Sequence, residues 1–357
     1  MISTPRTYRT VQALRAVAAL LVVAFHASEL WCQRLAPPGA RPWGQGSAGV
    51  DLFFVISGFV MAVSAAPLAA RPDGWRVFLW RRCVRILPLY WLMTTLKLAS
   101  VAALPGLVLR TRPDLWNGVA SYLLVPARDV AGVVRPVLPV GWTLSFEALF
   151  YALYALALGL RLPPLRVLLP VLLPLAGLGF WRAADWPALL RLADGLVLEF
   201  ALGVWLGRAV LAGRRIGAGM ALVLALAGGA LLLVSPSFGP ARAAAWGLPA
   251  LAVLAGAVGL ERRIGRHLPR GLLALGDASY AIYLSHGFVL PLAALPLRRF
   301  VAGGGVPEGL CVALGLAVSV GVGWGVHRWV ERPLNERLKS LIGQGLINKF
   351  VNSPNVI

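Results

Sequence analysis

Two ionisable side chains, Arg15 and His26, lie within the first apolar stretch of membrane length, which reads LRAVAALLVVAFHASEL. Their spacing is about three helical turns, so both fall on one stripe of a helix, about 16 Å apart along its axis. Charge inside a transmembrane helix is costly and usually faces a cavity or a partner. The pair therefore indicates a polar path through most of the bilayer, unless Arg15 extends to the interface and His26 bonds a neighbouring helix.

Two further segments place polar side chains near the start of an apolar run. GVDLFFVISGFVM begins with small residues and Asp51, which either pairs with an arginine or caps the helix start. RRCVRILPLYW carries Arg82 and Arg85, three residues apart and therefore on one helix face. Their fork-shaped guanidinium groups suit a phosphate or pyrophosphate, although such arginines also anchor a span at the cytoplasmic interface.

Two later apolar runs contain groups able to take part in proton transfer. WTLSFEALFYALY holds Glu147, which needs a histidine or arginine partner, either for chemistry or in a structural ion pair. GDASYAIYLSHGFVL places Tyr283 and His286 on one face, where His286 has a chemical role or bonds another helix. The chain has no HExxH, CxxC, phosphate-loop or G-x-S-x-G motif, so we expect no metal site and no serine-hydrolase elbow.

The composition identifies an integral membrane protein. The 357-residue chain is 59% hydrophobic and 13% charged, with a mean hydropathy of +0.76. Its net charge of +20 comes from short basic segments between apolar runs, as the positive-inside rule and anionic lipids require, so no nucleic-acid partner is expected. The three cysteines are too few and scattered for a disulfide framework. Arg15 interrupts the first apolar run, which argues against a cleavable signal.

The apolar runs predict an all-α integral membrane fold with about ten transmembrane helices in one bundle. The predicted spans are 12–31, 48–66, 84–104, 140–160, 165–181, 192–211, 217–234, 243–260, 272–296 and 309–329.

The placement of basic residues predicts the orientation of the chain. With the N-terminus inside, the cytoplasmic segments and adjoining span ends carry about twice as many Lys and Arg as the outer ones. Both termini are then cytoplasmic. The longest connection, 105–139, is outside, and its PDLWNGVASYLLVP portion is expected to form an interfacial or re-entrant helix. We expect one transmembrane domain over residues 1–335 and a cytoplasmic tail over 336–357, with no appended catalytic domain.

Taken in order, these segments resemble the membrane acyltransferase-3 family, and the resemblance continues to VERP at 330–333. The resemblance implies a ten-helix protein that acylates sugars, polysaccharides, lipids or antibiotics. The family's first-helix pattern of arginine, ten residues and histidine is present as Arg15 and His26. Its third-helix arginines correspond to Arg82 and Arg85, and its fourth-helix glutamate to Glu147. The start YRTVQALRAVAALLVVAFHA looks most like exopolysaccharide O-acyltransferases, which implies a bacterial inner-membrane location.

The residues themselves fit acyl transfer to a hydroxyl, which needs a base and positive charge that holds an anionic donor. His26 is the expected base or transient acyl carrier, with Glu147, or alternatively Glu29 three residues after His26, as its orienting carboxylate. Arg82 and Arg85, with Arg15 at similar depth, are expected to bind the phosphates of acetyl-CoA or another acyl-CoA. That donor is a substrate, and no permanently bound cofactor is expected.

The expected substrate-binding residues are Arg15, Arg82, Arg85, Asp51, Tyr283 and His286. The expected acceptor is a hydroxyl of a glycan, a lipid-linked sugar or a similar compound. The alternative function is a transporter or flippase of a glycolipid or polysaccharide precursor, because intramembrane charge also marks transport paths. Against it, no duplicated half or corresponding pair of broken helices is visible. A structural partner in envelope-glycan assembly is a third possibility.

Overall fold

The computed structural model describes residues 8–37, 39–103, 113–235, 241–297 and 306–345. This part of the chain is helical and contains no strand, only an isolated bridge between Arg128 and Val134. The all-α prediction is therefore confirmed. The α-helices are α1 (Arg9–Arg34), α2 (Gly49–Ala65), α3 (Gly74–Ala103), α4 (Leu115–Tyr122), α5 (Trp142–Gly159), α6 (Pro164–Leu178), α7 (Val197–Leu211), α8 (Ala218–Val234), α9 (Leu248–Ile264), α10 (Arg270–Ala294), α11 (Glu308–Val326) and α12 (Arg332–Gly345).

Each predicted span coincides with a helix, but the count of about ten spans is not confirmed. Six helical segments of the described chain are long and apolar enough to cross a membrane. They are Arg9–Arg34, Gly44–Leu68, Gly74–Ala103, Pro139–Gly159, Ala243–His267 and Glu308–Leu338. Helices α6, α7 and α8 have only 15, 15 and 17 residues, fewer than the roughly 20 that a bilayer needs.

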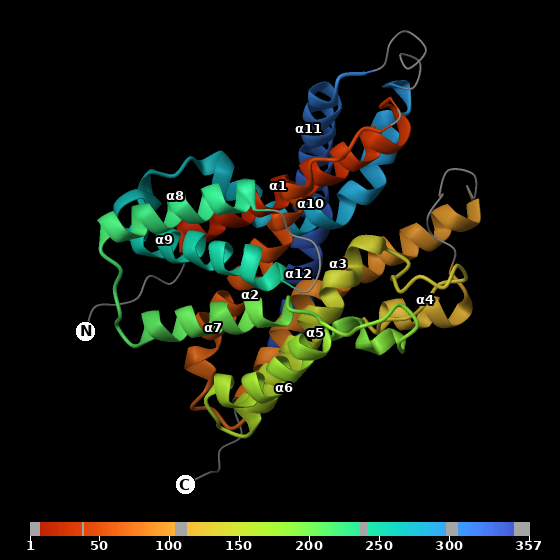
Figure 1. Ribbon diagram of the computed structural model, residues 1–357. Helices are drawn as coiled ribbons and strands as arrows, with labels where there is room; N and C mark the ends of the chain where they lie inside the picture. Colours follow the sequence, from red (N-terminus) through yellow and green to blue (C-terminus); the bar gives the residue numbers. More distant parts are fainter. Residues whose placement is uncertain (1–7, 38, 104–112, 236–240, 298–305, 346–357) are drawn as a thin grey trace.

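The helices pack against one another in groups, and Figure 1 labels each helix. Helix α1 runs beside α10 and α11 and also contacts α2 and α9, while α2 pairs with α7 and α8 pairs with α9. Helices α2 and α7 are in close contact at Gly58, where an added Cβ atom would lie only 2.1 Å from the carbonyl oxygen of Phe200. A Cβ atom at Gly203 would meet the carbonyl oxygen of Val55 at the same distance. Small residues here let the two backbones come into contact.

The first turn of α1 is held by a side chain that is distant in sequence. Glu261 of α9 accepts hydrogen bonds from the backbone N–H groups of Arg9 and Thr10, at 3.0 and 2.8 Å. It also accepts from the Thr10 hydroxyl at 2.6 Å. Since the first four N–H groups of a helix have no partner within it, Glu261 caps α1 and fixes where the helix carrying Arg15 begins.

A short helix, α4, forms within the 105–139 connection, where an interfacial or re-entrant helix was predicted. Asp114 caps it by accepting from the Asn117 N–H group, and the Tyr90 hydroxyl donates to the Ser121 carbonyl at 3.0 Å. Leu115 and Trp116 are 87% and 61% exposed. Helix α4 is therefore anchored to α3 while it presents large apolar side chains outward, as an interfacial helix does.

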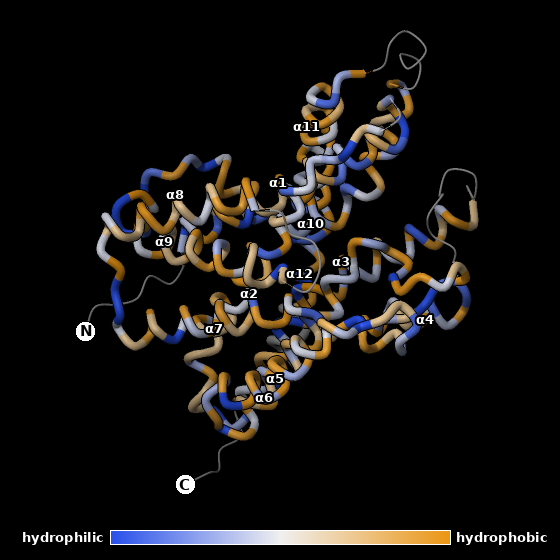
Figure 2. The backbone as a smooth tube through the Cα atoms, viewed as in Figure 1, coloured by the Kyte–Doolittle hydropathy of each residue, from blue (hydrophilic) through white to orange (hydrophobic). Residues whose placement is uncertain are grey.

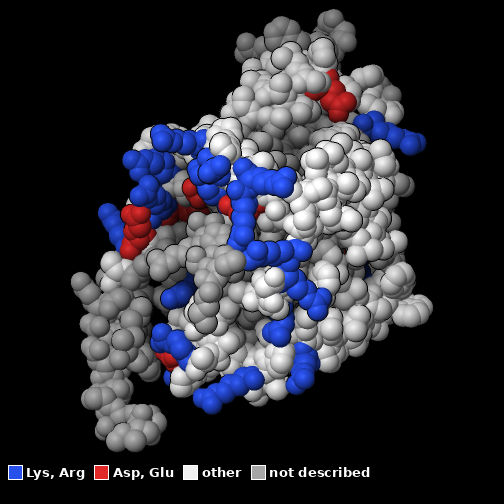
Figure 3. Space-filling view, turned by 90° about the vertical axis from the view of Figure 1, so that its left-hand side faces the viewer, with Lys and Arg blue, Asp and Glu red and all other residues white. Residues whose placement is uncertain are grey.

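Hydrophobic residues run along most of the helix lengths, whereas hydrophilic residues gather at helix ends and connections (Figure 2). The face seen in Figure 3, which includes the α7–α8 connection, carries many Lys and Arg side chains and few acidic ones. Exposed arginines of the segments predicted to be cytoplasmic and of the adjoining span ends include Arg71, Arg76, Arg81, Arg161, Arg166, Arg208, Arg214, Arg215, Arg262, Arg263, Arg266, Arg270, Arg332 and Arg337.

Candidate functional site

A cavity of about 160 Å³ lies among α1, α2, α3, α5 and α10. Its walls include three arginines, Arg15, Arg82 and Arg85, and one carboxylate, Glu147. The lining is completed by apolar side chains, by the hydroxyl residues Ser57, Thr143 and Ser279, and by Tyr151, Tyr280 and Tyr283. The fold thus brings five of the predicted site residues to one cavity, with Tyr283 as the fifth, although they come from four different helices.

The three arginines are held in different ways. Arg82 donates to the Ser64 hydroxyl at 2.6 Å and lies over the ring of Tyr151, 5.9 Å from its centroid. Arg15 donates to the Gln12 side chain at 3.3 Å. Arg85 is exposed while also lining the cavity, which places it where the cavity opens. Three cations around one opening favour an anionic ligand, because each is stabilised when a phosphate or carboxylate binds.

Glu147 is held inside the cavity by two hydroxyl groups. Ser57 of α2 donates to its Oε1 atom at 2.9 Å, and Tyr151 donates to its Oε2 atom at 2.7 Å. Tyr151 follows Glu147 by four residues and so shares its helix face, a spacing that is visible in the sequence but was not used there. In the described part of the chain, Glu147 is thus hydrogen-bonded to hydroxyl groups and not to His26.

His26 lies outside the cavity lining and beside two other predicted residues. Its Nδ1 atom is 3.1 Å from Oε2 of Glu29, the alternative orienting carboxylate. Its ring stacks on that of His286, with centroids 5.0 Å apart and planes at 28°. The structure therefore brings His26 to Glu29 and His286, whereas Glu147 faces the arginine-lined cavity.

Tyr283 connects the cavity to the histidine pair. Its ring lines the cavity, and its hydroxyl donates to the Val140 carbonyl at 2.8 Å and lies 3.0 Å from the Thr143 hydroxyl. Its backbone carbonyl lies 2.6 Å from Nδ1 of His286, and the two rings are 5.8 Å apart. One turn of α10 therefore connects the two places: Tyr283 borders the cavity, and His286 contacts His26.

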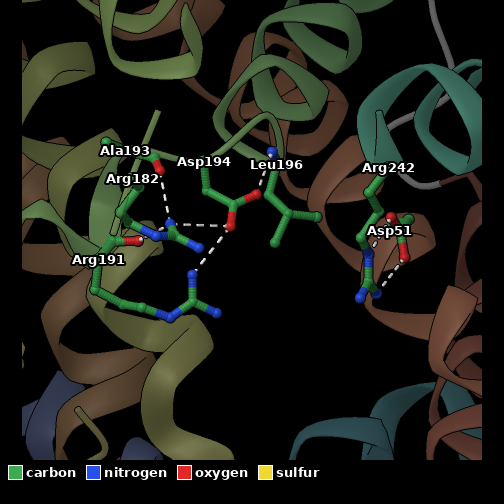
Figure 4. Close-up of polar contacts among 7 residues, drawn as sticks. All are labelled: Asp51, Arg182, Arg191, Ala193, Asp194, Leu196 and Arg242. Carbon is green, nitrogen blue, oxygen red and sulfur yellow. Dashed lines mark hydrogen bonds and ion pairs between the residues drawn. The ribbon is translucent and has the colours of Figure 1, made fainter. Parts of the chain in front are cut away.

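Asp51 takes part in an ion pair away from the cavity. Its oxygens accept two hydrogen bonds from Arg242, at 3.0 and 2.7 Å, and its side chain is fully buried (Figure 4). Helix α2 has no side-chain cap, so the arginine alternative is correct and the capping alternative is wrong. Glu199 is also fully buried, and neither of its carboxyl oxygens has a hydrogen-bond partner in the described chain. Sequence reasoning missed Arg242 and Glu199, which stand at the starts of separate helices.

A second ionic cluster, also shown in Figure 4, stabilises the segment before α7. Asp194 accepts hydrogen bonds from Arg182 and Arg191, at 3.3 and 3.0 Å, and from the Leu196 N–H group at 3.2 Å. Arg182 also donates to the Ala193 carbonyl at 2.6 Å. These contacts satisfy both arginines within the protein, so we assign this cluster a structural role. In the residues that the structure describes, no group of three or more His, Cys, Asp or Glu side chains can hold a metal ion.

Comparison with known proteins adds an independent observation. A family model described as an acyltransferase domain, that of the acyltransferase-3 family, matches residues 8–328. The chain is 36% identical to the exopolysaccharide production protein ExoZ of Rhizobium meliloti (strain 1021), over 82% of this chain and 90% of ExoZ. It is 32% identical to the putative membrane-bound transacylase BcsY of Komagataeibacter xylinus, over 78% of this chain and 72% of BcsY.

A third relative is the acyltransferase MdmB of Streptomyces mycarofaciens, which is 28% identical over 81% of this chain and 80% of MdmB. No solved structure matches the chain. The family match covers α1 to α11, including the cavity and the histidine pair. The chain therefore belongs to the acyltransferase-3 family and is an enzyme that transfers acyl groups.

Proposed function

We propose that this enzyme is an integral-membrane O-acyltransferase that moves an acyl group, most simply acetyl, from acyl-CoA to a hydroxyl of a glycan or lipid-linked sugar. The observation that carries the proposal is the grouping of Arg15, Arg82, Arg85 and Glu147 around one cavity. Tyr283 of the same cavity lies one turn of α10 before His286, whose ring stacks on His26 of the His26–Glu29 pair. The arginines supply a site for an anionic donor, and His26 supplies a base.

The phosphates of the donor bind at the arginine-lined opening. The cavity of about 160 Å³ is smaller than the roughly 300–1,000 Å³ of typical ligand pockets. It therefore holds only part of the donor's pantetheine arm, whose thioester end points past Tyr283 toward His286 and His26, and the nucleotide remains outside, near the exposed Arg85. Since CoA is cytoplasmic, this opening faces the cytoplasm, which agrees with the basic connections (Figure 3) and with cytoplasmic termini in a bacterial inner membrane.

Transfer then needs one proton acceptor beside the acceptor hydroxyl. Glu29 accepts the Nδ1–H of His26, which leaves the Nε2 lone pair free to remove the hydroxyl proton. The oxygen attacks the thioester carbonyl, the C–S bond breaks, and His26 returns its proton to the CoA thiolate. In this scheme Glu147 balances the charge of the arginines and is not the partner of His26.

The relatives support the acceptor class. ExoZ is named for exopolysaccharide production. A glycan or lipid-linked sugar offers hydroxyls to a membrane enzyme at the outer side of the bilayer, near which the predicted orientation places His26.

The test is direct transfer by purified protein. Incubation with acetyl-CoA labelled in the acetyl group and with a panel of exopolysaccharide fragments should give labelled glycan, and His26→Ala should abolish it. An acyl-enzyme that gathers label without acceptor, with ping-pong kinetics, would make His26 a carrier rather than a base. Failure of wild-type protein to bind acetyl-CoA, together with uptake of a glycolipid into vesicles, would overturn the proposal in favour of transport.

A further inference from the structure

One buried nitrogen near the reaction centre has no hydrogen-bond partner. His286 is 1% exposed, and its Nδ1 atom lies 2.6 Å from the Tyr283 carbonyl oxygen. Because a carbonyl only accepts, Nδ1 carries the hydrogen and donates it, and Nε2 carries the lone pair. No donor in the described chain reaches Nε2. Leaving a buried acceptor unpaired costs about 1–3 kcal/mol, so this atom calls for a functional explanation.

The neighbouring histidine is oriented in the same sense. His26 donates its Nδ1–H to Glu29 at 3.1 Å, so its Nε2 atom also carries a lone pair. The two rings stack with centroids 5.0 Å apart. The His26 side chain is 34% exposed, whereas Nε2 of His286 is buried, so a ligand reaches the pair first at the His26 ring. Two adjacent imidazoles therefore each present an acceptor nitrogen.

We propose that His286 binds a second hydroxyl group of the acyl acceptor, which donates a hydrogen bond to Nε2 of His286 while His26 removes the proton of the reacting hydroxyl. The reacting hydroxyl has one hydrogen, and His26 takes it, so the donor to His286 must be a different group. His286 binds and orients the acceptor without gaining or losing a proton.

This inference rests on the proposed O-acyl transfer and narrows its substrate class. The acceptor has at least two neighbouring hydroxyls, as a sugar does, whereas an alcohol with one hydroxyl would leave the His286 nitrogen unpaired. Sites that hydrogen-bond a substrate hydroxyl discriminate strongly against analogues that lack it. His286 is thus expected to determine both the acceptor class and which hydroxyl is acylated.

The experiment combines variants with deoxy analogues. Methyl glycosides of glucose, galactose and mannose are tested with wild-type protein and labelled acetyl-CoA, and the best acceptor is compared with its monodeoxy forms. His286→Phe keeps a flat ring for stacking but removes the nitrogen, whereas His286→Gln offers an amide oxygen as acceptor. Removing one hydroxyl other than the acylated one should lower wild-type kcat/KM about tenfold to a hundredfold.

With the parent glycoside, His286→Phe should lower kcat/KM by the same factor. With the deoxy glycoside that lacks the second hydroxyl, His286→Phe should lower kcat/KM little further. His286→Gln should recover part of the rate. The affinity for acetyl-CoA should not change. The inference would be overturned if His286→Phe and wild-type protein acetylated the parent glycoside at equal rates. It would also be overturned if the substitution and the missing hydroxyl lowered kcat/KM independently, so that their factors multiplied. If His286→Phe does not fold, unchanged wild-type rates across all deoxy forms would overturn it. If none of the glycosides is acetylated, the inference about His286 is also overturned. That result counts against the proposed function only if the protein also fails to bind acetyl-CoA.

Discussion

At the residue scale, the central question is which carboxylate assists His26. Glu29 is 3.1 Å from the ring, whereas Glu147 receives hydrogen bonds from Ser57 and Tyr151. We expect His26→Ala to lower kcat by about 10²–10⁴. Glu29→Gln should also lower kcat, by a smaller factor, because a neutral amide does not stabilise the imidazolium ion. Glu147→Gln should lower kcat little and should not raise KM for acyl-CoA, because it removes a negative charge beside the site for an anionic donor. Steady-state kinetics of the three variants test this assignment. If Glu147→Gln lowered kcat as much as His26→Ala while Glu29→Gln remained active, Glu147 and not Glu29 would be the partner of His26.

The arginines at the cavity opening give a second prediction at this scale. Lysine at position 85 keeps the charge but loses the planar fork that suits a pyrophosphate. Arg85→Lys should therefore weaken acyl-CoA binding several-fold, and Arg85→Ala about tenfold to a hundredfold, since a charged hydrogen bond contributes about 1.5–3 kcal/mol. Calorimetric titration with CoA measures both. Arg166→Lys, an exposed change on α6 outside the cavity lining, is the matched control, and equal affinities in all variants would remove Arg85 from the donor site.

At the element scale, the cap that α9 provides to α1 should contribute to stability. Glu261→Ala leaves two backbone N–H groups and the Thr10 hydroxyl without their acceptor. Loss of a cap typically costs about 0.5–2 kcal/mol, so the melting temperature in detergent should fall by a few degrees. Glu336→Ala, which removes an exposed ion pair with Arg332, should have a much smaller effect. Identical melting of the two variants would show that α1 does not depend on Glu261.

The α2–α7 contact provides a second test at this scale. In Gly58→Ala the added Cβ would lie 2.1 Å from the Phe200 carbonyl, so the two backbones must separate, and overpacking of this kind costs about 1–3 kcal/mol. Gly229→Ala on α8 adds a Cβ with no atom within 4 Å and should be neutral or slightly stabilising. The yield of monodisperse protein and its melting temperature should separate the pair; a Gly58→Ala protein as stable as Gly229→Ala would contradict the close packing.

At the scale of the whole molecule, the distribution of charge predicts the orientation in the membrane. The basic face in Figure 3 should be cytoplasmic. In a variant without Cys32, Cys83 and Cys311, a cysteine at position 214 should react with an impermeant maleimide only after the cells are opened. A cysteine at position 115 on α4 should react in intact cells. The reverse pattern would invert the orientation and move the donor site to the other side of the membrane.

Much of the architecture was predictable because the relevant energies are local. Each apolar residue contributes its own favourable free energy of transfer into lipid, so hydropathy alone predicts a helix at each span. The same pattern does not set helix length, since Pro163 precedes α6 and a short 3₁₀ helix, Ala188–Leu192, forms before α7, which begins within the predicted span. In the described part of the chain, six helical segments are long and apolar enough to span a membrane, so the predicted count of about ten is not confirmed.

Residue types and motif order were sufficient to identify the family and the candidate groups Arg15, His26, Arg82, Arg85 and Glu147. The sequence also contained the pairing of His26 with Glu29, because residues three apart share a helix face. Which distant helices meet was decided only by tertiary packing. Asp51 pairs with Arg242, 191 residues away, and His26 stacks on a histidine of α10. Such partners depend on how whole helix surfaces fit together, which no local pattern encodes.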